Sequence, residues 1–240
     1  MPAQTVRYEG ELGTSLVGAI ACPTHGVGPF PAVLVVHDAF GIGKHTIERA
    51  ERLAEMGYVA LAVDMFGDGR ACQTIQEGLE LVNEVASDPK KLAARISAAA
   101  ATLKAQGNVD PARLGAIGFC FGGTVVLEFA RSGAAVQAVC SFHGTLATKR
   151  PAAKGMSAGV LICHGDSDPL VPPEQVAAFC EEMRAAEADW QLEIYGGVKH
   201  GFTKPEADAA GIPALSYNAN ADRSSWNTMA QFMRRRLIDA

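Results

Sequence analysis

Short, wholly apolar runs alternate along the chain with longer segments in which apolar residues recur every three or four positions. The runs at 32–36, 58–63 and 158–163 are rich in Val, Leu, Ile and Ala, which is the composition of strands buried on both faces of a sheet. The segment 46–56 has the spacing of an amphipathic helix and ends at Gly57. This alternation predicts an α/β fold with a mostly parallel sheet and helices on both of its faces.

The complete pattern predicts about seven to eight strands. We place strands at 5–9, 15–21, 32–36, 58–63, 113–119, 136–142, 158–163 and 190–195. We place helices at 46–56, 74–86, 89–106, 124–131, 173–188 and 222–237. The first two strands are expected to form a hairpin at the edge of the sheet. A chain of 240 residues that is nearly half apolar is expected to form a single domain, 1–240.

One cysteine lies where a predicted strand meets a predicted helix. The segment 118–123, G-F-C-F-G-G, joins the strand 113–119 to the helix 124–131. A nucleophile between glycines at such a junction is typical of the nucleophile elbow of α/β-hydrolases, whose usual nucleophile is serine. The N–H groups at the helix start favour a thiolate. We therefore predict that Cys120 is a nucleophile; the alternative is a structural cysteine in a glycine-rich turn.

Two carboxylates follow the apolar run 158–163. Asp166 and Asp168 both lie on the loop where the acid of a catalytic triad is expected. Asp168 is favoured because Pro169 restrains the loop directly after it. Asp166 is better suited to cap the turn by an Asx-type hydrogen bond.

A histidine completes the set. His200 lies on a loop with glycines on both sides, after the predicted strand 190–195. Nucleophile, acid and histidine then follow one another in the chain order of α/β-hydrolases. The sequence therefore predicts a Cys–His–Asp triad.

These motifs carry a resemblance to a known family. They are V-L-V-V-H-D-A-F-G at 33–41, D-M-F-G at 64–67, the cysteine turn at 118–123, H-G-D-S-D at 164–168 and K-H-G-F at 199–202. Over nearly its whole length the chain resembles the dienelactone hydrolase family of α/β-hydrolases. The resemblance implies a single-domain α/β-hydrolase fold that acts on small carboxylic esters or lactones, without a metal or an organic cofactor.

The expected mechanism is acyl transfer through a thioester. His200 removes the proton of Cys120, and Asp168 fixes the histidine tautomer. The thiolate attacks a carbonyl carbon, and two backbone N–H groups hold the resulting oxyanion. We expect these N–H groups to be those of Phe121 and Ala39. Water activated by the histidine then releases the acid.

The resemblance also implies a carboxylate in contact with the nucleophile, and Asp38 occupies that position. The family member best known for this feature has glutamate there, so the shorter aspartate leaves a looser contact. Asp38 could hold the resting cysteine as a thiol or act as its base. The alternative is a turn or capping aspartate before the helix 46–56.

Substrate-binding candidates come from the same loops. Lactone-opening members of the family use two arginines to hold a substrate carboxylate. In this chain Lys204 stands four positions after the catalytic histidine, and Arg70 follows the predicted strand 58–63. Lysine keeps the charge but loses the bidentate geometry. Phe40, His143 and Phe202 are further candidates.

Composition narrows the class of protein. The net charge of −5 and the pI near 5.7 argue against nucleic-acid and anionic-membrane partners. No apolar stretch reaches the ~20 residues of a membrane span, and the first ten residues lack a hydrophobic leader. The six cysteines lack C-x-x-C spacing, so we expect reduced thiols in a cytoplasmic protein. We expect a monomer, with a dimer as the alternative.

Other functions remain open alternatives. The same thiolate and oxyanion donors could attack an activated phosphotriester. A non-catalytic member of the fold is possible if the triad is not assembled. In a redox role, Cys140 would be the candidate partner of Cys120.

Overall fold

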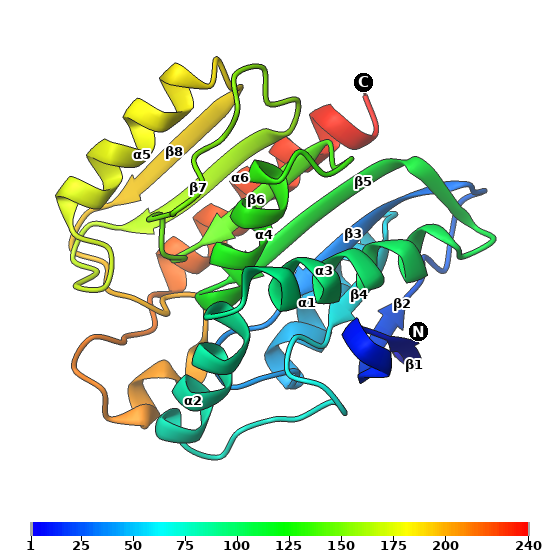
Figure 1. Ribbon diagram of the computed structural model, residues 1–240, viewed down its shortest axis with the longest axis horizontal. Coiled ribbons are helices and arrows are strands. Elements are labelled where there is room, and N and C mark those ends of the chain that lie inside the picture. Colours follow the sequence, from blue (N-terminus) through cyan, green and yellow to red (C-terminus); the bar gives the residue numbers. More distant parts are fainter. Residues whose placement is uncertain (1, 240) are drawn as a thin grey trace. The chain divides into compact units, whose positions relative to one another are not determined.

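The computed structural model describes residues 2–239, and its elements follow the predicted alternation (Figure 1). The strands are β1 (Gln4–Glu9), β2 (Ser15–Ala21), β3 (Phe30–Val36), β4 (Val59–Val63), β5 (Val109–Phe119), β6 (Ala138–Phe142), β7 (Gly159–Gly165) and β8 (Trp190–Tyr195). The α-helices are α1 (Lys44–Glu55), α2 (Ile75–Ala86), α3 (Pro89–Lys104), α4 (Phe121–Arg131), α5 (Pro173–Ala185) and α6 (Ala219–Leu237). Two short 3₁₀ helices are η1 (Glu11–Gly13) and η2 (Pro205–Ala210).

Within residues 2–239, eight strands form one sheet in the order β1-β2-β4-β3-β5-β6-β7-β8. The pairs β1–β2 and β2–β4 are antiparallel, whereas β3–β4, β6–β7 and β7–β8 are parallel. In the edge hairpin, Gln4 pairs with Ile20 and Glu9 pairs with Ser15. The predicted hairpin and the predicted mostly parallel α/β sheet are therefore confirmed.

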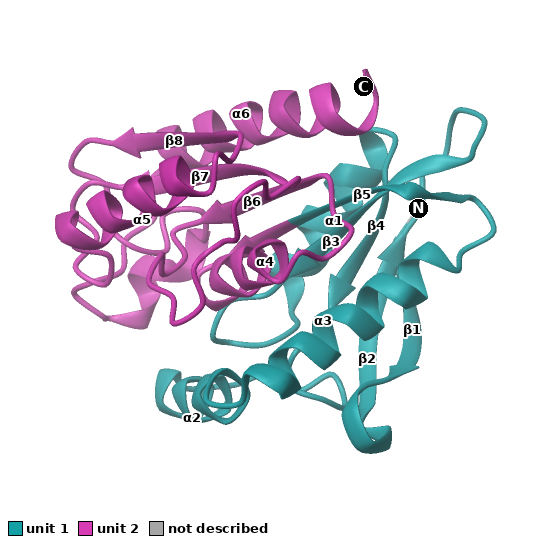
Figure 2. Cartoon of the chain, turned by 45° about the horizontal axis from the view of Figure 1, so that its top comes forward, with its two compact units in different colours: residues 1–116 teal, residues 117–240 magenta. Residues whose placement is uncertain are grey.

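The chain separates into two compact units, residues 1–116 and residues 117–240 (Figure 2). The boundary falls within β5. The expectation of a single domain over 1–240 is not tested by this division and stays a prediction.

In the first unit, the core is built on β3 and β4. Every residue of β4 is buried, and all of β3 except Phe30 is buried, as their apolar sequences predict. Helices α1 and α3 cover opposite faces of these strands (Figure 1). Helix α1 buries one stripe, which includes Ala50 and Leu53, because its apolar residues recur at helical spacing.

In the second unit, β6 and β7 form the buried centre. All of their residues are buried. Helices α4 and α6 lie on opposite faces of β6 (Figure 1). Helix α5 packs Phe179 edge-on against Trp190 of β8, with ring centroids 5.9 Å apart.

The structure differs from the sequence-based prediction at the start of α4 and at η2. Helix α4 begins at Phe121 rather than at 124, because the turn at Cys120 leads directly into helical backbone. The two glycines that follow, which normally disfavour helix, are tolerated in its first turn. The helix η2 was not predicted, since its short sequence P-E-A-D-A-A carries no apolar period.

Candidate active site

Cys120 lies at a strained corner between β5 and α4. Its φ of 53° and ψ of −116° are rare for a residue with a side chain. A Cβ added to Gly118 would overlap the backbone carbonyl of Gly122, and one added to Gly123 would overlap Oγ of Ser141. The glycines of the motif thus allow strand, corner and helix to approach closely.

Asp168 and His200 come together from the loops that follow β7 and β8. Oδ2 of Asp168 lies 2.7 Å from Nδ1 of His200, and both residues are 3 % exposed. The other carboxylate oxygen of Asp168 accepts the Leu170 N–H at 2.8 Å, which fixes the acid in its loop. Asp166 is exposed, and its Oδ2 accepts the Gly197 N–H at 3.4 Å instead. Of the two candidate acids, the fold brings Asp168 to the histidine.

The pKa of His200 depends on the charge of Cys120. Burial by itself lowers the pKa of His200, but the negative charge of a Cys120 thiolate and the hydrogen bond to Asp168 outweigh it and raise the pKa to about 10. Among residues 2–239, no hydrogen bond of acceptable geometry reaches Nε2 of His200, although the atom is buried. A loose sulfur–imidazole contact of this kind is common before substrate binds.

His143 directly follows β6 and contacts the backbone of the nucleophile. The amide N–H of Cys120 donates to the Phe142 carbonyl at 2.9 Å and to Nδ1 of His143 at 3.1 Å. Nε2 of His143 lies 2.8 Å from Oγ1 of Thr203. Both ring nitrogens are therefore engaged by the protein. The expected contact of His143 with substrate stays a prediction.

Thr203 was missed by the sequence analysis, although it follows the K-H-G-F motif directly. Its side chain is wholly buried. A lone threonine in a loop has no feature that distinguishes a buried hydrogen-bonding role from a solvent-exposed one. Only the contact with His143 identifies it.

The other predicted residues of the second unit lie close to this cluster in sequence, but their positions differ. Phe202 is completely buried, and its ring packs edge-on against His143 with centroids 5.1 Å apart. Phe121 is the first residue of α4, the position from which helix N–H groups point outward. Lys204 is the N-cap residue of η2 and is partly exposed.

In the first unit, Asp38 makes the kind of turn that the alternative interpretation described. Its Oδ1 accepts the Phe40 N–H at 2.8 Å, and Asp38 is 9 % exposed. Ala39 is also buried, and a Cβ added to Gly78 of α2 would overlap its carbonyl oxygen. Helix α2 therefore packs tightly against the backbone that carries the second expected oxyanion donor.

Arg70 is held near the same loop by backbone pairing. Gly41 and Ala71 form an isolated antiparallel bridge, which fixes the position of the Arg70 segment relative to the loop after β3. The guanidinium of Arg70 donates to the carbonyl oxygens of Gly67 and Phe66. Its expected role in substrate binding stays a prediction.

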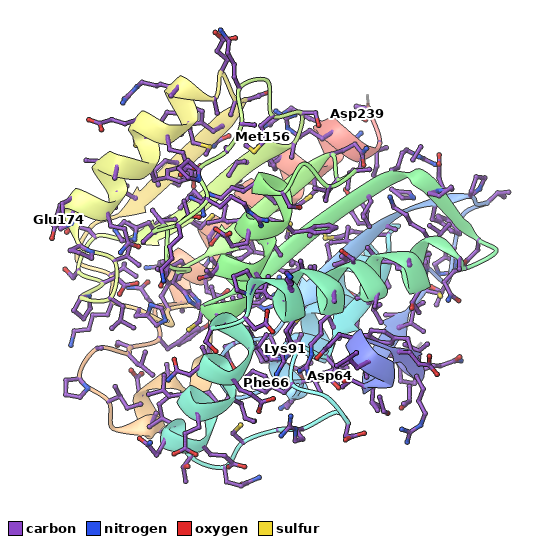
Figure 3. The ribbon with its side chains drawn as sticks, in the orientation of Figure 1. Asp64, Phe66, Lys91, Met156, Glu174 and Asp239 are labelled. Carbon is purple, nitrogen blue, oxygen red and sulfur yellow. The ribbon has the colours of Figure 1, made fainter. Side chains whose placement is uncertain are left out.

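Asp64 organises the loop that leads to Arg70. Its buried carboxylate accepts backbone N–H groups of Val17, Phe66, Gly67 and Gly69 at 2.7–3.0 Å. Asp64 and Phe66 are labelled at the end of β4 in Figure 3. The D-M-F-G motif thus has a structural explanation: one carboxylate satisfies the donors of a tight loop.

The other thiols do not form a second reactive site with Cys120 in the part of the chain that the structure describes. The six cysteines are free. Burial, followed by the neighbouring Cys163, raises the pKa of the Cys140 thiol well above its ordinary value, which disfavours a reactive thiolate there. In the part of the chain that the structure describes, no group of three or more His, Cys, Asp or Glu side chains is arranged to hold a metal ion. None of the described helices is both long and apolar enough to cross a membrane.

Comparison with known proteins adds an independent line of evidence. The model of the dienelactone hydrolase family matches residues 16–237. A protein of Methylorubrum extorquens that carries the provisional name carboxymethylenebutenolidase is 31 % identical over 225 residues, covering 89 % of this chain and 75 % of that protein.

Two solved structures are similar along almost their entire length. One is a dienelactone hydrolase-like promiscuous phosphotriesterase, P91, from metagenomic libraries, with 37 % identity, a TM-score of 0.92 and coverage of 97 % of each chain. The other, named m3DLH, has 40 % identity, a TM-score of 0.92 and coverage of 98 % of each chain.

Proposed function

Because the chain belongs to the dienelactone hydrolase family, and is thus a hydrolase acting on ester or lactone bonds, we propose that it cleaves small substrates of this class with a Cys120–His200–Asp168 triad. The observation that carries the proposal is the buried His200. Its Nδ1 bonds to Asp168 at 2.7 Å, and its pKa responds to the charge of Cys120. Acyl transfer by a triad requires a base that is oriented by an acid and can exchange a proton with the nucleophile. His200, Asp168 and Cys120 would fill these three roles.

The proposed reaction has two halves. Before the first half begins, the proton of Cys120 has passed to Nε2 of His200. The thiolate sulfur then forms a bond to the substrate carbonyl carbon, whose double-bond electrons move onto the oxygen. The imidazolium then protonates the departing alkoxide as the carbon–oxygen bond breaks, which leaves a thioester. In the second, water gives a proton to His200 and its oxygen attacks the thioester carbon, so that the acid departs and the thiol is restored.

Asp168 supports both halves through His200. Its carboxylate accepts the Nδ1 proton, which keeps Nε2 directed at the reacting atoms and stabilises the imidazolium. We propose that the Phe121 N–H, at the start of α4, is one donor to the oxyanion. The Ala39 N–H remains the expected second donor. A single such donor contributes roughly 3 kcal/mol to lowering the barrier.

The base for Cys120 has two candidates. The effect of the Cys120 charge on the pKa of His200 favours His200. The alternative, Asp38, rests on the family resemblance. If Asp38 holds the resting cysteine as a thiol, Asp38→Asn raises the rate of Cys120 alkylation at neutral pH. If it does not, that rate is unchanged in Asp38→Asn and falls in His200→Ala.

A second activity is proposed because of one particular relative. The structure that is 37 % identical over 97 % of this chain is named a promiscuous phosphotriesterase. The same thiolate could attack an activated phosphorus centre and expel an aryloxide, while the oxyanion donors hold the phosphoryl oxygen. Paraoxon turnover no greater than that of Cys120→Ala would exclude this activity.

The decisive experiment combines turnover with trapping. Wild type and Cys120→Ala are assayed with p-nitrophenyl acetate and with a small unsaturated lactone. The masses of the intact proteins are then measured by mass spectrometry after rapid quenching. We expect turnover and an acyl adduct in wild type, and neither in Cys120→Ala. Wild-type turnover that persists in Cys120→Ala would refute the cysteine mechanism while leaving the hydrolase assignment intact.

A further inference from the structure

His143 occupies a backbone position that a histidine seldom adopts. Its φ of 42° lies in the left-handed region, where residues with a side chain are uncommon. It is only 3 % exposed and follows the last residue of β6. Such a conformation persists where the surrounding contacts require it, and it is often found at functional sites.

The hydrogen bonds of the ring determine its tautomer. The Cys120 amide is a donor, so Nδ1 of His143, 3.1 Å away, accepts and carries no proton. The proton of the neutral ring is therefore on Nε2, which donates to Oγ1 of Thr203 at 2.8 Å. The hydroxyl of Thr203 is completely buried, so the partner of Nε2 is held in place.

The same ring also contacts the catalytic base. The ring centroids of His143 and His200 are 5.0 Å apart, with an edge-on interplanar angle of 66°. Phe202 packs on another side at 5.1 Å. His143 thus joins the backbone of the nucleophile to the ring of the base, although it is not a member of the triad.

We propose that His143 is a positioning residue. As the neutral Nε2–H tautomer, set by the Cys120 amide and held by Thr203, it fixes the amide of Cys120 and the ring plane of His200. The inference rests on the proposed function for its catalytic consequence. In this role His143 acts through Cys120 and His200. It acts by limiting the motion of the nucleophile corner, where an error of about 1 Å is costly to rate.

We expect the fold not to depend on the hydrogen bond between the Cys120 amide and Nδ1 of His143. The Cys120 amide also donates to the Phe142 carbonyl at 2.9 Å, so the amide keeps a partner when the histidine is removed. We therefore expect a loss of rate with little loss of stability. A single net hydrogen bond corresponds to a change of up to about tenfold.

The test compares two substitutions that both accept a positive φ. In His143→Asn, the side-chain oxygen lies near the position of Nδ1 and can accept the Cys120 N–H. In His143→Gly, the backbone is unstrained but the acceptor is gone. We expect kcat for p-nitrophenyl acetate to fall about tenfold in His143→Gly with KM nearly unchanged, and to recover most of that loss in His143→Asn.

The tautomer is measured directly on wild type with ¹⁵N-labelled histidine. NMR at pH 7 is expected to show His143 neutral, with its proton on Nε2; the His143→Asn spectrum assigns the signals. Thr203→Val keeps the histidine and its bond to the Cys120 amide but removes the Nε2 partner, so we expect the Nε2–H tautomer to persist while kcat falls because the ring is less firmly held. This variant also decides the question if His143→Gly does not fold.

Several outcomes would overturn the proposal. They are full kcat in His143→Gly, equal impairment of His143→Asn and His143→Gly with unchanged thermal stability, or a wild-type ring that is charged or protonated on Nδ1. If wild type shows no ester turnover above Cys120→Ala, the proposed function fails instead. The NMR result and the rate of Cys120 alkylation by iodoacetamide then still decide the role of His143.

Discussion

At the scale of single residues, two carboxylates on one loop differ in their burial and in their hydrogen-bond partners. Asp168 is buried against His200, whereas Asp166 is exposed and accepts a long bond from Gly197. We predict that Asp168→Asn lowers kcat/KM for p-nitrophenyl acetate by about 100-fold or more, because the imidazolium loses its charged partner. Asp166→Asn, the matched control, is expected to change it by less than about twofold. Equal effects of the two substitutions would contradict this assignment.

The pKa of His200 leads to a pH prediction. Because that pKa is raised to about 10, the imidazolium persists from neutral pH to about pH 10, and it stabilises a thiolate at Cys120 over that range. Alkylation of Cys120 by iodoacetamide is therefore expected to be nearly independent of pH between about 7 and 9. In His200→Ala the positive charge beside the sulfur is gone, so the rate at pH 7 is expected to fall more than tenfold and to rise with pH. Peptide mass spectrometry separates Cys120 from the other thiols; identical profiles would contradict the ion pair.

At the scale of elements, the junction of β5 and α4 depends on one glycine. A Cβ at Gly118 would overlap the carbonyl of Gly122, which belongs to the first turn of α4. We predict that Gly118→Ala destabilises the protein by about 1–3 kcal/mol in urea unfolding and also lowers kcat, because the corner that carries Cys120 must move. Gly196→Ala is the control, since its Cβ would meet nothing within 4 Å. An active, fully stable Gly118→Ala would show that the corner is not strained.

Helix α2 provides a second element-scale prediction. Replacing a helical glycine by alanine ordinarily stabilises a helix by about 1 kcal/mol. At Gly78 the added Cβ would overlap the Ala39 carbonyl. If the Ala39 N–H is the second oxyanion donor, as we propose, activity falls instead, by about tenfold or more, because that donor is displaced. Gly43→Ala is the matched control, because it has open space around the added atom. Unchanged kcat in Gly78→Ala would argue against Ala39 as a donor.

At the scale of the whole molecule, the open question is whether residues 1–116 and 117–240 unfold together. Arg131 of α4 has a side chain that is 1 % exposed, and it bonds to Glu182 of α5 at 2.7 Å and to the Leu146 carbonyl at 2.9 Å. Arg131→Met leaves Glu182 without its buried partner and should cost about 3–5 kcal/mol. Arg150→Met, which removes an exposed pair, should cost less than about 1 kcal/mol.

We propose a single cooperative domain, and Arg131→Met tests it. Tryptophan fluorescence reports on Trp190 and Trp226 of the second unit, and hydrogen exchange of β4 amides reports on the first. In one domain, both probes shift to lower urea concentration by the same amount. A shift confined to the tryptophan probe would instead indicate two independently unfolding domains.

The sequence by itself determined the order of the elements and the loops that carry the chemistry. Apolar runs at 32–36, 58–63 and 158–163 are long enough and uniform enough that burial on both faces is their most stable arrangement, and the structure confirms these strands. Cys120, Asp168 and His200 follow successive strands, so their order along the chain could be compared with a known fold before any distance was known.

The tertiary structure alone decided which side chains meet. Pro169 favoured Asp168 over Asp166, but only the fold shows that Asp168 reaches His200. Nothing local shows that His143 accepts a bond from the Cys120 amide while its other ring nitrogen meets Thr203. These contacts join residues that lie 23 to 60 positions apart, and they depend on the paths of whole loops. Periodicity reports which face of an element is buried; it carries no information about the distance between two loops, and that distance determines the chemistry of the site.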